Sequence, residues 1–271
     1  MIQQFFSKKF QASQHNDCHF ILKVDETVWH WGIINVLTHE LMGISGGNYS
    51  QIHEIQKMIE PLNLPSFRNR SLILISSHHL LIPKSLYQEQ HLDKFFRFFI
   101  DKNNDEDVLS NDMFLLDAVN VFSFEHDLND FALHNFGHES VVHISTALLK
   151  SSYHISKQHF SPVLLIGIYQ KTAVFILSDG GKVLLSNHFK VLTNEDLLYW
   201  AIRLFDQFEL DAAKSLIYLV GDKMQTVEQL FFLKRYFEHA ALLPWPSFIT
   251  PASDIPDSLL SSLTEALYFL K

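Results

Sequence analysis

The order of secondary-structure elements in the last 110 residues constrains the fold most strongly. Short apolar runs bounded by turn residues indicate strands, whereas longer runs with helical spacing indicate helices. The predicted elements are strands Pro162–Tyr169, Thr172–Ser178 and Lys182–His188, a helix from Thr193, a strand Ser215–Val220, a helix from Thr226, a short strand near Phe248 and a helix from Pro256. We therefore expect an α/β unit with a mixed sheet flanked by helices, in the order βββαβαβα.

Local signals support several of these boundaries. Asp179 and Gly180 lie between two apolar runs, which predicts a hairpin because both residue types tolerate positive φ. Thr193 with Asp196, and Thr226 with Gln229, have the spacing of an N-terminal capping box. Pro256 suits the first turn of the last helix, where a missing N–H costs little.

The first half of the chain predicts a looser copy of the same unit. The expected elements are strands His19–Val24 and Thr27–Ile33 around a turn at Asp25-Glu26, a helix over Ile52–Leu62, a strand Leu72–Ile75, a helix over Leu92–Phe99, an exposed loop Asn103–Asp112, a strand Ala118–Phe124, a helix Leu128–Phe136 and a strand Ser140–Ile144. This half exceeds the second by about one strand–helix pair. We expect two domains, residues 1–158 and 159–271.

Several segments resemble a known family. They are Leu115–Phe122, Phe131–Phe136, His143–Leu149, Asn194–Trp200 and the turn Gly221-Asp222. Together they are similar to an uncharacterised bacterial family of unknown function whose members adopt an actin-like ATPase fold. The resemblance spans nearly the whole chain and implies two ribonuclease H-like lobes. It implies no established activity.

The resemblance also implies where a nucleotide would bind. Active actin-like ATPases hold phosphates between two strand turns that carry aspartate with glycine, and a Gly-Gly turn accepts the nucleoside. Asp25 and Thr27 match the first turn in kind, but its glycine is absent and Glu26 would repel a phosphate. Asp25 and Thr27 are therefore weak candidates for nucleotide binding.

The second turn is expected at Ile168–Thr172, and no acidic residue occurs between Pro162 and Leu177. The third turn, Gly221-Asp222, keeps one glycine of two, so Gly221 and Asp222 are weak candidates for nucleotide binding as well. Aspartate and glycine are also common at strand ends for conformational reasons alone. We therefore predict no catalytic residues, and ATP with Mg²⁺ as cofactor only if the site still works.

Two further motifs suggest other chemistry. Gly43-Ile44-Ser45-Gly46-Gly47 matches the nucleophile elbow of serine hydrolases, which needs a strand before it and a helix after it. Residues 36–42 make a poor strand, so a flexible glycine loop is the favoured interpretation and a hydrolase the alternative. The 16 histidines include His78-His79 and the group His134, His138 and His143 with Glu139, yet none has a recognised ligand spacing. We predict no metal site.

Composition narrows the partners and the compartment. A formal net charge of −9 disfavours nucleic acid, and the single cysteine, Cys18, fits a reducing compartment. No apolar run approaches the roughly 20 residues of a membrane helix, so we expect a cytoplasmic protein without a membrane partner. The favoured function is a non-catalytic scaffold or regulator with an unknown protein partner or a second copy of itself. The alternative is a divergent ATPase or kinase that uses Asp25, Gly221 and Asp222.

Overall fold

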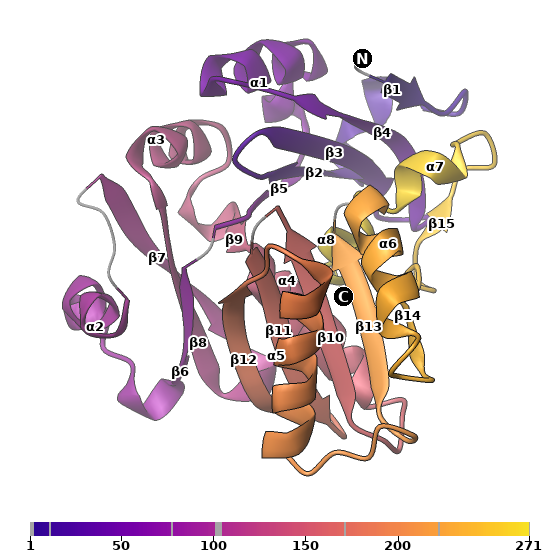
Figure 1. The fold of residues 1–271 in the computed structure, drawn as a ribbon. Coiled ribbons are helices and arrows are strands. Elements are labelled where there is room, and N and C mark those ends of the chain that lie inside the picture. Colours follow the sequence, from indigo (N-terminus) through magenta and orange to yellow (C-terminus); the bar gives the residue numbers. More distant parts are fainter. Residues whose placement is uncertain are drawn as a thin grey trace.

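The computed structural model describes residues 3–10, 12–76, 78–100, 105–170, 172–221 and 223–270, and it contains three sheets (Figure 1). The first has the order β1-β4-β3-β2-β5-β9, with β15 beside β4. Its strands are β1 (Gln3–Phe6), β2 (Cys18–Val24), β3 (Val28–Asn35), β4 (Glu40–Asn48), β5 (Asn69–Leu74), β9 (Val141–His143) and β15 (Thr250–Pro251). We call it the N-terminal sheet.

The second sheet, the C-terminal sheet, has the order β12-β11-β10-β13-β14. Its strands are β10 (Val163–Tyr169), β11 (Thr172–Asp179), β12 (Lys182–Lys190), β13 (Leu216–Gly221) and β14 (Ala240–Leu242). The first three strands are antiparallel, and the last two run parallel to β10. The strands β4-β3-β2-β5-β9 repeat this order and these directions. The predicted duplication of one βββαβαβα unit is therefore present.

The helices after β12 follow the prediction with three corrections. The capping box at Thr193 and Asp196 begins α5 (Asn194–Gln207) as expected. In contrast, α6 (Lys223–Leu233) starts directly after β13, so Thr226 lies buried inside the helix and does not cap it. A short strand does lie near Phe248, but it is β15 and pairs with β4 of the N-terminal sheet, whereas the strand that pairs with β13 is β14. The last helix is divided into α7 (Asp257–Leu260) and α8 (Thr264–Tyr268).

A third, three-stranded sheet is inserted between β5 and β9, and it corrects the predicted loop at residues 103–112. Its order is β6-β8-β7, formed by β6 (His79–Pro83), β7 (Glu106–Met113) and β8 (Ala118–Glu125), with α2 (Leu92–Phe99) between β6 and β7. Polar side chains on β7 bond to neighbouring elements: Asp107 accepts from Asn129, and Asn111 donates to the Val141 carbonyl. Those bonds explain a polar strand; Asn103 and Asn104 lie outside the described residues.

The glycine-rich segment is also a strand and not a flexible loop, because large side chains on adjacent strands fill the space above its glycines. A Cβ on Gly43 would lie 3.2 Å from the Trp31 ring, and one on Gly46 would lie 2.3 Å from the His30 ring. Ser45 sits in the middle of β4, and α1 (Ile52–Ile59) begins seven residues later. The strand-to-helix turn of a hydrolase elbow is therefore absent at Ser45.

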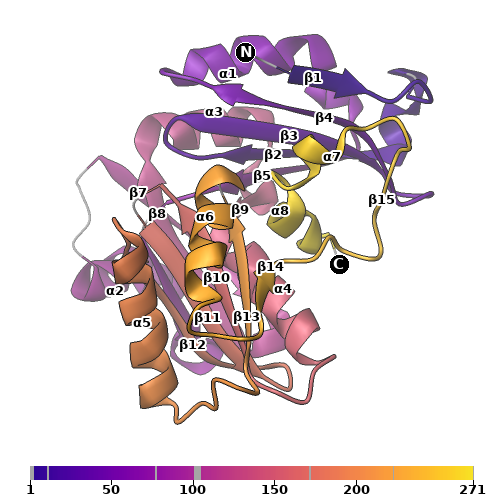
Figure 2. The same ribbon diagram turned by 45° about the vertical axis from the view of Figure 1, so that its right-hand side comes forward.

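Helices α4 (Ile144–Ser156) and α8 pack between the two large sheets and form one core with their inner faces. The outer face of the N-terminal sheet packs against α1 and α3 (His126–Asn135), and that of the C-terminal sheet against α5 and α6. Figure 2 shows the C-terminal segment returning to the N-terminal sheet, where β15 pairs with β4. The predicted domain boundary falls in the turn between α4 and β10 and stays a prediction.

Within the described ranges, no helix is long and apolar enough to cross a membrane.

Candidate functional site

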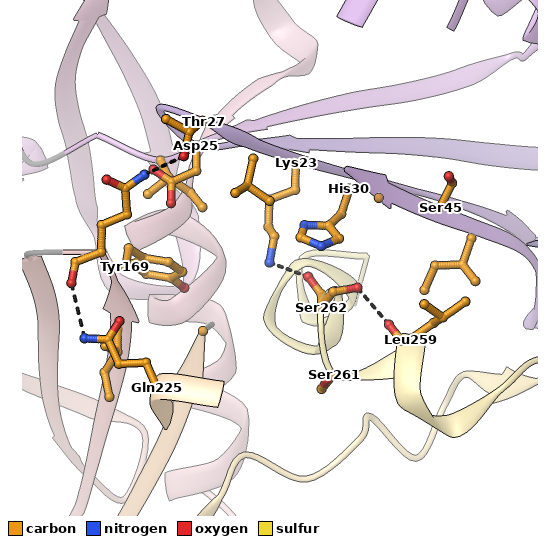
Figure 3. A pocket seen from close by; sticks show the side chains of 17 residues that line it. Lys23, Asp25, Thr27, His30, Ser45, Tyr169, Gln225, Leu259, Ser261 and Ser262 are labelled. Carbon is orange, nitrogen blue, oxygen red and sulfur yellow. Dashed lines mark hydrogen bonds between the residues drawn. The ribbon is translucent and has the colours of Figure 1, made fainter. Parts of the chain in front are cut away.

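A cavity of about 480 Å³ lies between the N-terminal sheet, the ends of β10 and β13 and the turn between α7 and α8 (Figure 3). We call it the interlobe pocket. Its polar lining residues are Lys23, Asp25, Thr27, His30, Ser45, Gln170, Gln225, Ser261 and Ser262, together with Tyr169. Three of the four predicted nucleotide-binding residues, Asp25, Thr27 and Gly221, line this pocket; Asp222 lies outside the described residues.

The first turn is held by bonds to its own backbone and to the facing lobe. The Asp25 N–H donates to the Val28 carbonyl, and Oδ1 of Asp25 accepts from the N–H of Glu26. Gln170 Nε2, on the turn between β10 and β11, donates to Thr27 Oγ1 over 3.2 Å. Thr27 therefore already bridges the two halves of the molecule at the position where the resemblance places a phosphate ligand.

Gly221 has a structural explanation that needs no nucleoside. Its φ is +130°, a conformation that side chains with a Cβ rarely adopt, and a Cβ there would lie 2.0 Å from the carbonyl oxygen of Ile168. Ile168 and Gly221 are paired residues of β10 and β13. The close approach of the two strands is sufficient reason for glycine at this position.

An aromatic side chain occupies the place where the second phosphate turn would need an aspartate. Tyr169, the last residue of β10, is buried, and its hydroxyl donates to Glu265 Oε1 over 3.4 Å. Burial raises the pKa of Tyr169 well above its usual value, and the nearby Glu265 and Asp25 carboxylates raise it further. The phenol therefore stays protonated and acts as a donor.

A buried ion pair lies at the wall of the pocket, and sequence reasoning missed it. Lys23 of β2 extends from the N-terminal sheet, and its Nζ lies 2.8 Å from Glu265 Oε1 of α8. The same ammonium donates to the Ser262 carbonyl. The exposed fractions of the two side chains are 7% and 0%. A lysine inside an apolar strand was a signal, since a buried charge needs a partner, but the partner lies 242 residues away.

His30 lies beside Lys23 on the adjacent strand, since the two residues are directly paired across β2 and β3. Figure 3 shows both side chains pointing from the sheet into the pocket, whereas the Ser45 hydroxyl points away from it. Burial lowers the pKa of His30 to about 3, and the charge of Lys23 contributes to the same direction. The imidazole is therefore neutral at neutral pH and adds no cation to the pocket.

These residues do not fit a magnesium triphosphate. Mg²⁺ in proteins is held by carboxylates and phosphate oxygens, and the phosphates are held by backbone N–H groups and cations. Asp25 supplies one carboxylate, but the charge of Lys23 is neutralised by Glu265, and Tyr169 fills the second turn. What the pocket can do is bind a small polar group or hold the two lobes together through Lys23, Glu265 and Gln170.

The group of His134, His138 and His143 that was singled out as a metal candidate is dispersed, whereas His78 and His79 lie near His143 and His188. His134 lies in α3, His138 follows it, and His143 ends β9 in a buried position. In the part of the chain that the structure describes, no three histidine, cysteine, aspartate or glutamate side chains are arranged to hold a metal ion.

Comparison with solved structures shows the fold. A protein from Bacteroides thetaiotaomicron VPI-5482, described as having an actin-like ATPase fold and unknown function, is 14% identical. The alignment has a TM-score of 0.77 and covers 96% of this chain and 98% of the other. A chain of the PilM–PilN type IV pilus biogenesis complex is 11% identical, with a TM-score of 0.56 and coverage of 92% and 95%. The predicted actin-like fold is confirmed.

No functionally curated protein matches this chain. A family model, described as protein of unknown function (DUF3822), matches residues 7–240. The predicted membership of an uncharacterised family is therefore confirmed, and the chain belongs to the DUF3822 family of proteins of unknown function.

Proposed function

We propose that this protein is a non-catalytic member of the actin-like fold that works by binding another protein, as a scaffold or regulator. The observation that carries the proposal is the buried ion pair that joins Lys23, in the wall of the interlobe pocket, to Glu265 of α8, with the Tyr169 hydroxyl bonded to the same carboxylate. In this position the chain's own C-terminal segment takes up the cation that a phosphate would need. When both lobes are kept but the phosphate contacts are lost, the outer surfaces of the protein are what can still carry a function, by binding another molecule.

Charge supports the same proposal. The charge of Lys23 is neutralised by Glu265, so the carboxylate of Asp25 makes the pocket lining acidic. The whole chain also has a formal net charge of −9. A polyanion entering this field is repelled rather than attracted. The same balance argues against nucleic acid as partner. The cytoplasm remains the compartment we predict from composition.

A protein with a similar fold illustrates how such a fold can serve in protein binding. PilM, whose structure was solved in the PilM–PilN type IV pilus biogenesis complex, combines this fold with a protein partner. By analogy of fold, we expect the present chain to bind a partner of its own or a second copy of itself.

Nucleotide binding is the second candidate, and one observation favours it: Asp25, Thr27 and Gly221 line a single cavity of about 480 Å³. In this alternative the protein is a divergent ATPase or kinase. Asp25 would then hold Mg²⁺ through its carboxylate. The pair between Lys23 and Glu265 would have to open for the lysine to reach a phosphate.

A thermal shift experiment separates the two functions. A ligand that binds the native state stabilises it by mass action, and for a chain of this size each kcal/mol corresponds to roughly 2–4 °C. We expect no shift in melting temperature with millimolar Mg-ATP or Mg-ADP. A shift above about 2–4 °C that depends on Mg²⁺ and disappears in Asp25→Asn would overturn the scaffold proposal.

The positive test is reconstitution with a partner. Affinity purification of the full chain from its native host identifies candidates, and each candidate is then purified and titrated against the protein by calorimetry. We expect stoichiometric binding that is unchanged by added nucleotide. Analytical ultracentrifugation of the protein alone tests self-association, and a monomer without any reconstituted partner contradicts the proposal.

A further inference from the structure

Four histidines meet where the three sheets of the molecule come together. His79 opens β6 of the three-stranded sheet and follows His78, His143 ends β9 of the N-terminal sheet, and His188 lies on β12 of the C-terminal sheet. The ring centroid of His79 lies 5.4 Å from that of His143 and 5.4 Å from that of His188. The centroids of His78 and His188 are 6.1 Å apart. We call this group the histidine junction.

The bonds of His143 define its protonation. The backbone N–H of Ser145 donates to Nδ1 of His143 over 3.1 Å, so this nitrogen carries a lone pair. Nε2 lies 3.1 Å from the carbonyl oxygen of Ser76 and therefore carries the proton. A second proton on Nδ1 would break this bond and turn to Ser145 Oγ, 2.6 Å away, which already accepts from Asn120. The bond from the Ser145 N–H thus favours the neutral imidazole.

On His79, which is buried, and His188, which is half-buried, one ring nitrogen lacks a partner for a second proton. Nε2 of His79 lies 3.3 Å from Ser186 Oγ, whereas Nδ1 of His79 and Nδ1 of His188 are buried with no hydrogen-bond partner among the described residues. Placing a proton on either Nδ1 would bury a charge without an acceptor, which is strongly unfavourable. Both rings are thus adapted to the neutral state.

A carboxylate faces His78 from a neighbouring element, whereas the other groups around the junction are uncharged when the imidazoles are neutral. Within the described ranges they are the four imidazoles themselves, Ser186 on β12, the Phe122 ring on β8 and Glu106 on β7, whose carboxylate lies 3.7 Å from Nδ1 of His78. Burial lowers the pKa of His143 to about 3 and that of His79 and His188 in the same direction, and positive charge on a neighbouring histidine lowers them further. Protonating His79, His143 and His188 therefore costs free energy while the sheets stay in contact.

We propose that the histidine junction is an acid-sensitive contact that docks the three-stranded sheet on the C-terminal sheet at neutral pH and releases it when the imidazoles take up protons. β6 contacts β12 here, so release separates these two strands. The three-stranded sheet stays tied to the N-terminal sheet, because Asn111 of β7 donates to the Val141 carbonyl and accepts from the N–H of His143. The opening is thus local and has a defined direction.

The test is a distance measurement across this contact. Lys94→Cys on α2 and Arg203→Cys on α5 place spin labels on exposed positions of the two sides, and the native Cys18 is buried. We expect one distance at about pH 7.5 and a growing longer-distance population towards about pH 4.5, since the reference pKa of histidine is near 6.5. Each histidine that gains a proton steepens the opening equilibrium by up to about tenfold per pH unit.

Variants assign the effect to the junction. His79→Gln with His188→Gln removes two of the titrating rings and should flatten the pH dependence, whereas His138→Gln, at an exposed position, should leave it unchanged. A distance that stays constant over this range overturns the proposal. So does a transition that survives in the double variant, or one that coincides with loss of the far-ultraviolet circular dichroism, because either indicates opening elsewhere.

If the double variant does not fold, the wild-type protein provides the readout. NMR signals of the imidazole Cε1–Hε1 groups report the protonation of each histidine. We expect the junction histidines to titrate together with the change in label distance. Titration near the ordinary pKa without any change in distance contradicts an acid-sensitive contact.

Discussion

The first strands of the two large sheets occupy equivalent places, yet their inner faces carry different chemistry. β2 presents Lys23 to the interlobe pocket and ends in the turn with Asp25, whereas β10 presents Gly167 and then Tyr169. A Cβ on Gly167 would lie 2.9 Å from the Tyr169 ring, so the glycine accommodates the aromatic side chain. The N-terminal unit has kept polar groups at the pocket, and the C-terminal unit has closed its side with an apolar ring.

The third strands differ as well. β4 is covered on one edge by β3 and on the other by β1 and β15, and its glycines lie beneath Trp31 and His30. β12 is an edge strand that is partly exposed along its length and contacts β6. The duplicated units have thus diverged where other segments were added: the C-terminal segment on the first, and the three-stranded sheet beside the second.

The largest expected effect comes from the pair that distinguishes the two inner faces. Glu265→Ala leaves the Lys23 ammonium buried without its carboxylate, and breaking such a pair typically costs about 3–5 kcal/mol of unfolding free energy. Urea unfolding followed by circular dichroism measures the loss. The matched control is Lys9→Ala, which breaks the ion pair between Lys9 and Glu40. The Lys9 side chain is 64% exposed, and exposed pairs contribute about 0–1 kcal/mol.

A double replacement sharpens this prediction. Lys23→Met with Glu265→Leu removes both charges and fills similar volume, so it should cost less than Glu265→Ala alone. If the Glu265→Ala variant is no less stable than the Lys9→Ala variant, the ion pair does not hold the lobes together. The scaffold proposal would then lose the observation on which it rests.

The second prediction compares two glycines of positive φ in the C-terminal unit. Gly221→Ala introduces a Cβ 2.0 Å from the Ile168 carbonyl oxygen, so β10 and β13 must move apart, and we expect a loss of about 3 kcal/mol. Gly180→Ala also places a Cβ at positive φ, but in the left-handed helical region (φ +55°) and with open space around it, and should cost about 1–2 kcal/mol. Equal losses in urea unfolding would show that the strand contact is not the reason for glycine at 221.

The order of elements was predictable where turn chemistry brackets an apolar run. Asp179 and Gly180 defined the hairpin between β11 and β12, and Thr193 with Asp196 defined the start of α5. β14 was missed because it has three residues and no alternating pattern. The glycines of β4 were wrongly assigned to a loop. They are needed because the rings of Trp31 and His30 on β3 fill the space next to them, and no local sequence pattern reveals that contact.

The site was predictable to the extent that it depends on strand ends. Asp25, Thr27 and Gly221 do meet in one pocket, as equivalent turns of a duplicated unit should, although nucleotide binding by them stays a prediction. Lys23 and Glu265 were missed because their contact depends on the docking of α8 between the sheets, which is a tertiary event. The histidine junction requires three sheets to be placed first.

The third prediction concerns pH and uses His30, on the N-terminal side of the pocket. Burial lowers its pKa in the folded state to about 3, below the unfolded value near 6.5, so the unfolded chain binds the proton more readily. Stability is therefore unaffected above pH 6.5 and falls as pH decreases below it. By linkage, His30 accounts for about 2 kcal/mol between pH 6.5 and pH 5. His30→Gln should reduce the slope of unfolding free energy against pH, with His138→Gln as the exposed control. An unchanged slope would contradict the burial argument.

The smallest expected effect tests the bond between the two turns that the resemblance places at a phosphate. Thr27→Val removes the acceptor for Gln170 Nε2 at an exposed position while keeping the β-branched shape. A single hydrogen bond contributes about 0.5–1.5 kcal/mol, and solvent exposure places this one at the lower end. Thr172→Val, on the neighbouring strand β11, is the matched control. A loss in Thr27→Val well above the control and above this range, measured by urea unfolding, would mean that the turns themselves hold the lobes together. The comparison of the two units would then shift from the buried ion pair of Lys23 to the exposed rim of the pocket.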